Sequence, residues 1–598
     1  MKKKGIASLP SVARNDGRGS PVQPSAMPQK PFWPGWVSIF LIIVLGFVVY
    51  ANSLGGKFLY DDARLVENNV YIKKWENLPK VLTEDIGAGA GSSYNYYNFY
   101  RPIQMITYMI DYSLWGKDPF GFHLTSILLH IAVALALYGL LNIFFGDRRV
   151  SFFAALLFAV HPVHTEAVSY IAGRADMLVA LFVLLFLARY VKSLDGSPVD
   201  GVMAVLCYAL ALMSKEYALI ALPLVGLYHY VFRKRLNRGV AATLFIITVI
   251  YVFLRATVFN FPSFNKAGGS PFFSRLPGFF VAIAQYIRLM VLPIDLHMEY
   301  GSYAFSFLDP PALAGVFILA SMIWTMVKFK NIKTIFFPLA WFLIALIPVS
   351  NLYPINAYMA EHWLYIPSMG IFFMASYGAF RLYDRKGFKI PSIIAMSAVV
   401  IYYSVLTVSQ NGYWKDAATF YERTLKYNPS SDRIYANLAT EYMMRGEHEK
   451  AIELFKETLK TSTDPAGLYN NLGIAYSAVK KETEAIEAYR KAIEANPAFA
   501  EAYNNLGVSY SMVGDSVNAA RAFKKAVEIN PNYADAYNNL GSQVTDMNEA
   551  IAAYERALAI NPNHANACYN LSMAYRRVGK IEEADRLYER ARALRPEN

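Results

Sequence analysis

Hydrophobic and polar positions divide the chain into an apolar first two thirds and a periodic last third. Twelve apolar segments precede residue 410, and each is a candidate to enter a membrane. Several are shorter than the about 20 residues that a transmembrane helix needs, so we expect tilted, broken or re-entrant helices among them. The segments are 36–53, 122–145, 151–164, 176–194, 201–213, 216–233, 239–257, 278–294, 311–328, 335–350, 363–381 and 390–408.

From about Trp414 the pattern becomes a repeat of 34 residues. Tyr-Asn-Asn-Leu, or a close variant, recurs at 435–438, 469–472, 503–506 and 537–540. A fifth copy, Tyr569-Asn570-Leu571, ends 31 residues after Leu540, three short of the period, which places a deletion in the turn around 542–548. This period, with Leu-Gly, Ala-Tyr and a closing Asn-Pro, is typical of tetratricopeptide repeats, in which paired helices stack into a solenoid. Residues 417–429 resemble the second helix of a partial leading unit.

The predicted fold is therefore all-α, with a polytopic membrane domain followed by an α-solenoid. Residues 1–35 are basic and rich in Pro, Ser and Gly, which predicts a disordered tail. The membrane domain is expected over 36–410 and the repeat domain over 411–598. The loop 54–121 is the longest polar stretch of the membrane part, and its Gly/Ser/Tyr-rich run at 87–100 is predicted to be a mobile lid.

Charge supports a membrane protein rather than a nucleic-acid-binding one. The whole chain has a net charge of +12, yet residues 411–598 hold 23 Lys and Arg against 25 Asp and Glu, so the excess belongs to residues 1–410. Lys and Arg in short loops mark the cytoplasmic side of a membrane protein. The two cysteines, Cys207 and Cys568, lie in different parts of the chain, so a disulfide framework is not expected.

The positions of the basic loops predict the topology. Four short loops are basic: 147–149, 233–238, 328–333 and 381–389. If successive segments cross in alternate directions, all four loops lie in the cytoplasm only if one segment between 239 and 328 does not cross. The best candidate is 278–294, which ends near Pro293 and carries Gln285 and Arg288. We therefore expect about 11 crossings, with the amino terminus in the cytoplasm and both the loop 54–121 and the repeats on the outer side.

The adjacent carboxylates Asp61 and Asp62 open this outer loop. Joint ionisation of such a pair beside a membrane is unfavourable, which suits a general base, a metal ligand or a substrate clamp. The alternative is a solvated loop start in which Asp caps the next turn. Because other polar residues are predicted at the same face, we favour the functional interpretation.

The segment His161–Asp176 is the next outer turn on this topology. His161 and His164, followed by Glu166, have the spacing of metal ligands, but they suit hydrogen bonds to a sugar equally well. Arg174 is a candidate partner for a phosphate. The alternative is an interfacial loop whose polar side chains cap helix ends.

Further ionisable residues fall at the predicted outer face. Lys215 and Glu216 lie between two apolar segments, where a simple ion pair is the alternative to a substrate contact. For Arg101 and Arg288 the alternative to a phosphate contact is a side chain that extends to the membrane surface. The remaining candidates are Asp176, Glu361, His362, His123 and His297. The sequence holds no P-loop, no dinucleotide-binding glycines and no Ser-His-Asp series on one predicted face.

With these blocks assembled, the chain resembles the transmembrane-and-tetratricopeptide O-mannosyltransferase family of the GT-C glycosyltransferases over about residues 36–598. The matching blocks, in order, are Phe58–Asp62, Tyr100–Pro102, Gly121–Leu124, His161–Asp176, Ser214–Glu216 and Ala360–Gly370, followed by the repeats. His362 stands where the family pattern usually has Arg, so a phosphate-binding role is not carried over to it. The repeats look prokaryotic in style, so we expect a prokaryotic member.

The resemblance implies a membrane glycosyltransferase that uses a polyprenyl-phosphate sugar, such as a mannose donor, and needs no nucleotide or other cofactor. A metal ion is not favoured. Asp61 is implied as the base that deprotonates an acceptor hydroxyl while the anomeric carbon inverts. Asp62 and Glu166 would orient acceptor or sugar, and Arg174, Lys215 and Arg288 are the phosphate candidates. The enzyme would lie in the inner or plasma membrane, with its repeats on the periplasmic or extracellular side.

The paired Asn residues of the repeats suggest the acceptor. Asn471, Asn505 and Asn539 recur at a fixed position and would line a groove that binds an extended polypeptide through its backbone. The alternative is that one Asn of each pair packs between helices. A non-enzymatic membrane scaffold for an envelope assembly would explain the repeats but not the outer ionisable cluster. A transporter of lipid-linked sugars would need internal pseudo-symmetry, which the sequence lacks.

Overall fold

The computed structural model describes residues 34–90, 98–261, 271–301, 305–352, 355, 357–429, 431–460, 462 and 464–594. These residues form helices and no strand, which confirms the all-α expectation for the part of the chain that is described. Residues 1–33 of the predicted tail and 91–97 of the predicted lid lie outside the described residues.

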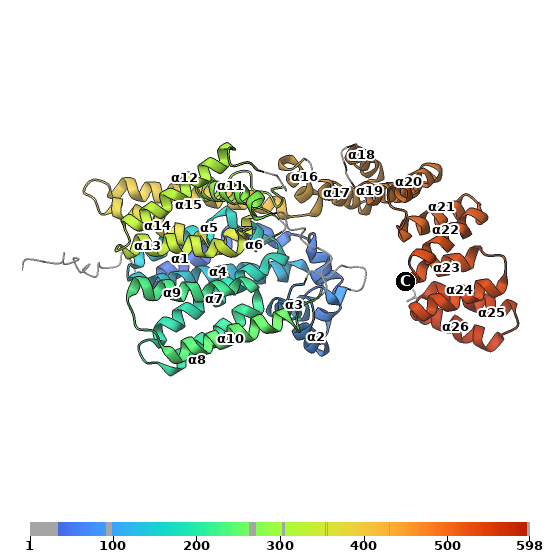
Figure 1. The fold of residues 1–598 in the computed structure, drawn as a ribbon, viewed down its shortest axis with the longest axis horizontal. Helices are drawn as coiled ribbons and strands as arrows, with labels where there is room; N and C mark the ends of the chain where they lie inside the picture. The colour runs from blue at the N-terminus through green and yellow to red at the C-terminus, as the bar shows by residue number, and fades with distance from the viewer. Residues whose placement is uncertain are drawn as a thin grey trace, which may run out of the picture.

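The membrane domain is an elongated bundle whose long helices run roughly side by side (Figure 1). Among the described residues, six of its helices are long and apolar enough to cross a membrane, or seven if the bent pair Arg148–Val160 and Pro162–Ser169 counts as one span. The predicted number of 11 crossings stays a prediction. The helices are α1 (Gly35–Tyr50), α4 (Pro119–Phe145), α5 (Arg148–Val160), α7 (Arg174–Ser193), α8 (Pro198–Ser214), α9 (Ala221–Phe232), α10 (Arg238–Ala256), α11 (Phe272–Val291), α12 (Pro310–Lys328), α13 (Lys333–Leu346), α14 (Ser368–Tyr383) and α15 (Lys389–Asn411).

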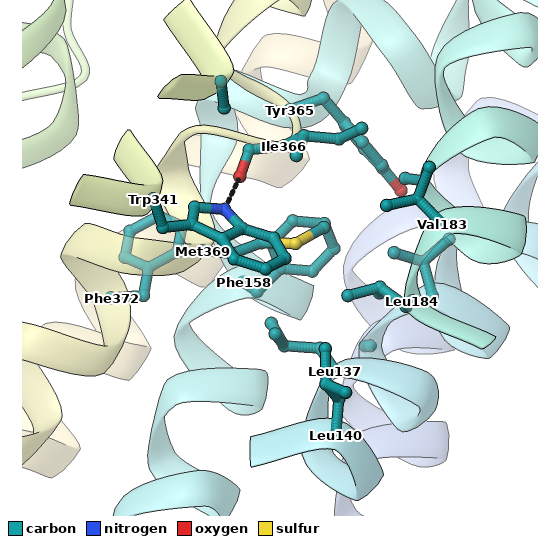
Figure 2. Packing of buried hydrophobic residues seen from close by; sticks show 14 of the residues in the cluster. Leu137, Leu140, Phe158, Val183, Leu184, Trp341, Tyr365, Ile366, Met369 and Phe372 are labelled. Carbon is teal, nitrogen blue, oxygen red and sulfur yellow. Dashed lines mark hydrogen bonds between the residues drawn. The ribbon is translucent and has the colours of Figure 1, made fainter. Parts of the chain in front are cut away.

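The bundle core lies where α4, α5, α7, α13 and α14 meet. Figure 2 shows Leu137 of α4, Phe158 of α5 and Leu184 of α7 facing Trp341 and Met369. The Trp341 indole N–H donates to the carbonyl of Ile366 at 3.0 Å, so the only polar atom of this large side chain is satisfied. This packing fixes the segment that precedes α14, in which Glu361 and His362 lie.

The basic loops gather at one end of the bundle. Arg149, at the start of α5, forms an ion pair of 3.0 Å with Asp384, just after α14. Lys333, at the start of α13, lies 5.3 Å from the ring centroid of Phe232, at the end of α9. We call this end the basic end, and its assignment to the cytoplasm stays a prediction.

Both ends of α11 lie at the opposite end of the bundle. Arg275, in its first turn, donates to the carbonyl of Asn351, which follows the outer end of α13. The carbonyl of Met290, in its last turn, accepts bonds from His161 and Tyr403, next to the outer ends of α5 and α15. Whether this segment crosses the membrane stays a prediction.

The outer loop folds into a small helical cap beside the bundle. It contains α2 (Leu78–Thr83) and α3 (Pro102–Trp115), together with short turns. Leu65, Met105, Tyr108 and Phe122 share its apolar core. This core holds the Asp61–Asp62 turn against the bundle.

The repeat domain consists of one leading helix and five helix pairs. The glycine of each Leu-Gly pair recurs because there is no room for a side chain at this position. A Cβ on Gly473 would lie 2.5 Å from the Tyr489 ring, and Gly507 and Gly541 contact Phe523 and Tyr554 in the same way. The deletion shortens α23 to 10 residues, against 13 in α21, so it removes helix as well as turn. The helices are α16 (Ala417–Tyr427), α17 (Asp432–Met444), α18 (His448–Thr458), α19 (Ala466–Ala478), α20 (Glu482–Ala495), α21 (Ala500–Met512), α22 (Ser516–Ile529), α23 (Ala534–Gln543), α24 (Met547–Ile560), α25 (Ala565–Arg577) and α26 (Ile581–Leu594).

The first units of the solenoid rest on the outer loop. Leu59 and Tyr170 share an apolar cluster with Trp414, Tyr421 and Leu438. From this junction the later repeats extend away from the bundle as an arc (Figure 1). The solenoid therefore begins at the same end of the bundle as Asp61.

Candidate active site

One segment, 161–176, contacts each of the outer loops that carry the predicted site residues. Pro162 ends α5, and the chain turns by 55° into α6 (Thr165–Ser169) and the short turn Ile171–Gly173. Within this segment, Glu166, Tyr170, Ala172, Arg174 and Asp176 each bond to a different partner outside it. The predicted residues thus meet around a shared segment, although many of them are already paired.

Asp62 fixes the acidic turn to this segment. Its carboxylate accepts the backbone N–H of Leu59 at 3.0 Å and that of Ala172 at 2.8 Å. Burial raises the pKa of Asp62 to about 8, although the two N–H donors oppose that rise. Because Asp62 is fully buried and both its oxygens are bonded, it serves to position the turn.

Asp61 is the more accessible member of the pair. It is partly exposed, and its backbone N–H donates to the Tyr170 hydroxyl at 3.2 Å. Burial raises the pKa of the Asp61 carboxyl, against the effects of the Tyr170 hydroxyl and of nearby Arg64, Arg433 and Arg101. A carboxylate with a raised pKa is a stronger base than an ordinary aspartate, which suits proton abstraction from a hydroxyl.

Two residues around Asp61, Tyr60 and Arg433, were missed by sequence reasoning. Tyr60 has a left-handed backbone (φ 49°), a conformation that is unfavourable for a residue with a side chain and often marks a functional turn. Arg433 of α17 donates to the Tyr60 hydroxyl at 2.8 Å and pairs with Glu299 at 3.3 Å. The positive φ leaves no signal in a single sequence, and Arg433 lies 373 positions away from Tyr60.

Three of the predicted cations are held by carboxylates. Arg174 is fully buried, pairs with Asp111 at 2.6 Å and donates to the carbonyl of Phe122 at 2.8 Å. Lys215 pairs with Asp176 at 2.6 Å, and Arg101 pairs with Glu216 at 3.1 Å. Lys215 and Glu216 therefore both form ion pairs, which was the alternative to a substrate contact. They pair with Asp176 and Arg101 and not with each other.

Arg288 differs from these cations. Its guanidinium donates to the Gln285 side chain at 2.7 Å, and no ion pair of the described residues includes it. Arg423 of α16, also missed by sequence reasoning, donates to the carbonyl of Leu296 at 3.4 Å and lies over the rings of Tyr413 and Tyr427. Burial lowers the pKa of His297, and the positive charges of Arg423 and Arg288 lower it further, so both guanidinium groups lie near this histidine. A phosphate could bind Arg288 and Arg423 without displacing a carboxylate, which is not true of Arg174, Lys215 or Arg101.

Two further carboxylates, Glu166 of the 161–176 segment and Glu361, bond to the chain around His297 and His362. Glu166 accepts the backbone N–H of His362 at 2.9 Å and lies 2.7 Å from its Nδ1. Glu361 accepts the backbone N–H of His297 and the hydroxyl of Tyr300, both at 2.6 Å. Burial, and then the charge of Glu166, raise the pKa of Glu361. A neutral Glu361 can donate a hydrogen bond, which a carboxylate cannot.

The histidines of the segment do not form a metal site with their neighbours. The Nδ1 of His161 accepts the N–H of Val163, so its Nε2 carries the proton and donates to the carbonyl of Met290 at 3.2 Å. His164 packs against Phe158 and Tyr365. Within the described ranges, no group of three or more His, Cys, Asp or Glu side chains could hold a metal ion. The cofactor requirement stays a prediction.

The paired Asn residues form a ladder between repeats. The side-chain nitrogen of Asn505 donates to Asn470 at 3.0 Å, that of Asn539 donates to Asn504 at 3.0 Å, and that of Asn570 donates to Asn538 at 2.9 Å. The first Asn of each pair is buried and the second is partly exposed. Asn505 and Asn539 therefore join neighbouring repeats, and each amide keeps one further N–H for an outside partner.

Family models match the repeat part of the chain. Models described as "TPR repeat" or "Tetratricopeptide repeat" match residues 408–466, 481–514, 500–533 and 544–598. Among solved structures, that of MamA is 29% identical, covers 26% of this chain and 94% of its own, and has a TM-score of 0.25. YrrB, described as a TPR protein with an unusual peptide-binding site, is 23% identical, covers 30% of this chain and 95% of its own, and has a TM-score of 0.26.

Several relatives match about two thirds of the chain. Protein O-mannosyl-transferase F38B6.6 of Caenorhabditis elegans is 28% identical over 67% of this chain and 59% of its own length. Protein O-mannosyl-transferase TMTC3 of Mus musculus is 26% identical over 69% of this chain, and TMTC4 of Homo sapiens is 24% identical over 71%. The chain spans between half and two thirds of the length of these relatives. All three are animal proteins, so they give no support to a prokaryotic origin.

Proposed function

Because this chain is a homologue of the TMTC protein O-mannosyl-transferases, we propose that it is a membrane glycosyltransferase that adds a mannose-like sugar to protein hydroxyl groups. The donor is a polyprenyl-phosphate sugar, and the reaction takes place at the end of the bundle that carries Asp61, on the outer face of the inner or plasma membrane. The observation that carries the proposal is the partly exposed Asp61 carboxylate, whose pKa is raised and which lies beside Tyr170 on the shared segment.

In the proposed reaction Asp61 acts as the general base. It accepts the proton of a Ser or Thr hydroxyl as the hydroxyl oxygen bonds to the anomeric carbon from the face opposite the lipid phosphate. The bond between the anomeric carbon and the phosphate oxygen breaks, and the electron pair leaves with the lipid phosphate. Inversion at the anomeric carbon follows from this in-line arrangement.

The leaving phosphate needs cations that are not already neutralised. Arg288 fits this role, and Arg423 extends it, since neither forms an ion pair among the described residues. Arg174, Lys215 and Arg101 act indirectly, because their carboxylate partners hold them as supports of the surrounding loops. Glu361, in its neutral form, can donate to a phosphate or sugar oxygen.

The solenoid supplies the acceptor. Its first pair of helices contacts the acidic turn through Arg433 and Tyr60, so a polypeptide bound along the repeats would start next to Asp61. The partly exposed Asn471, Asn505 and Asn539 keep amide groups for contacts with a peptide backbone, which is independent of side-chain sequence.

Transfer by the purified full-length protein tests the proposal. Wild-type protein in lipid nanodiscs is incubated with polyprenyl-phosphate mannose and a Ser/Thr-rich polypeptide, and the glycosylated product is measured by mass spectrometry. Asp61→Asn should lower the rate at least about 100-fold, since general bases contribute on that order. The matched control is Asp118→Asn, an exposed N-cap on the same outer side whose backbone contact survives in Asn.

Two results would contradict the proposal. An Asp61→Asn rate equal to that of Asp118→Asn would remove Asp61 as the base. Absence of transfer and of donor hydrolysis by the wild-type protein, with polypeptide binding intact, would favour the non-enzymatic scaffold.

A further inference from the structure

A large apolar cavity lies at the basic end of the bundle, away from Asp61. Its volume is about 600 Å³, within the range of small-molecule binding sites. It lies between α1, α5, α14 and α15, and its lining includes Leu41, Phe152, Phe380, Met396 and Val400. Its apolar lining excludes a polar substrate and matches the chain of a lipid.

The cavity exists because α15 contacts the bundle unevenly. Its outer half is fastened by hydrogen bonds from Thr407 to the carbonyl of Val160 at 2.7 Å and from Asn411 to that of Val49 at 2.8 Å. In its other half, Ile390 is 70% exposed and Ile394 is 63% exposed. An apolar chain from the bilayer would supply the packing contacts that the side chains lining this space lack.

A positive charge lies at the mouth of the cavity. Arg148 lines it and is exposed, and no ion pair or hydrogen bond of its side chain occurs among the described residues. The neighbouring Arg149, by contrast, is bound by Asp147 and Asp384. The Arg148 guanidinium lies 4.0 Å from where a Cβ of Gly35 would stand, at the start of α1. That helix has no side-chain cap, so its amino-terminal end, with its partial positive charge, lies at the same point.

We propose that this cavity binds an anionic phospholipid from the leaflet at the basic end. One acyl chain occupies the space beneath α15, and the phosphate lies between Arg148 and the amino terminus of α1. Charge complementarity selects an anionic over a zwitterionic lipid, as basic pockets between membrane helices do. The site is separate from the donor site, since Asp61 lies at the opposite end, and the proposal does not depend on the transferase activity.

Lipid retention by the full-length protein tests this site. Protein is purified from nanodiscs that contain equal amounts of phosphatidylglycerol and phosphatidylcholine, and bound lipid is counted by native mass spectrometry. Wild-type protein should retain phosphatidylglycerol in clear excess. Arg148→Gln should lower that retention about tenfold, because it removes a charge-assisted bond. The control is Arg235→Gln, an exposed arginine between α9 and α10 that does not line the cavity.

A second variant tests the acyl-chain part. Val400→Trp places a large side chain in the cavity and should lower retention of phosphatidylglycerol while leaving the headgroup residues in place. Equal retention of the two lipids by wild-type protein would overturn the proposal, as would equal effects of Arg148→Gln and Arg235→Gln. Displacement of phosphatidylglycerol by an equimolar polyprenyl phosphate would also overturn it, because the cavity would then be a site for the donor lipid.

Discussion

At the scale of residues, the ionisable groups around the 161–176 segment differ in whether they already have a partner. Arg174 is buried and its charge is neutralised by Asp111. Removing one member of a buried ion pair leaves an unpaired charge and destabilises a protein by about 3–5 kcal/mol. We therefore expect Arg174→Ala to lower the free energy of unfolding by this amount, measured by thermal or denaturant unfolding in detergent.

Two comparisons make that prediction specific. Arg174→Met combined with Asp111→Leu should recover part of the loss, because it removes both charges. Arg288→Ala should leave the unfolding transition nearly unchanged and raise the KM for the donor lipid instead. An Arg174→Ala protein with unchanged stability and a raised donor KM would return Arg174 to the role of phosphate ligand.

The pKa of Asp61 predicts the pH dependence of transfer. A general base must be ionised, so kcat/KM should rise with pH through the pKa of Asp61 and then level off. Because burial raises that pKa, the inflection should lie above the about 3.9 of an unperturbed aspartate. The profile is measured with wild-type protein and with Asp118→Asn. An inflection at or below the ordinary value in both would contradict the assignment.

At the scale of elements, the repeats and the apolar helices could be predicted because their signals are local. The Leu-Gly spacing reflects one contact, Gly473 against Tyr489, which recurs in each repeat. The charge pattern also predicted that 278–294 does not cross, and in the structure the contacts of Arg275 and Met290 place both ends of α11 away from the basic end. The partners of the ionisable residues could not be predicted, because Arg174 meets Asp111 and Lys215 meets Asp176 across long separations in the chain. In the sequence, where its partner Asp111 cannot be identified, Arg174 was therefore predicted to be free to bind a phosphate.

The contact between the solenoid and the acidic turn changes how a truncation should be designed. Deleting residues 466–598 removes α19 to α26 and leaves α16 to α18 on the outer loop. We expect this variant to keep hydrolysis of the donor lipid and to lose transfer to the polypeptide by at least about tenfold, because most of the acceptor surface is gone. Both rates are measured in the same nanodiscs.

A longer truncation provides the contrast. Deleting residues 412–598 also removes Trp414, Tyr421 and Arg433, which pack on or bond to the acidic turn. That variant should lose donor hydrolysis as well. Retention of full hydrolysis by the longer truncation would mean that the first repeat does not support the catalytic turn.

At the scale of the whole molecule, the two ends of the bundle carry different groups. The basic end gathers Arg149, Lys333 and the apolar cavity, while Asp61, Glu166 and Glu361 lie at the other end, on or near the 161–176 segment. The solenoid begins at the end that carries Asp61, as the contact of Tyr170 with Trp414 shows. A membrane that separates the two ends would therefore place the repeats and Asp61 on one side.

This polarity gives the last prediction, which concerns topology. Cys207 and Cys568 are both buried, so replacing them with Ala yields a cysteine-free background. Single cysteines are then introduced at Met512 in the solenoid, at Glu76 in the outer loop and at Lys386 at the basic end, all of which are exposed. A membrane-impermeant maleimide added from outside should label the first two positions in intact cells. Lys386→Cys should be labelled only after the membrane is permeabilised, since basic loops stay in the cytoplasm. Labelling of Glu76→Cys without Met512→Cys would place the repeats across the membrane from Asp61 and contradict both the topology and the proposed delivery of a polypeptide acceptor.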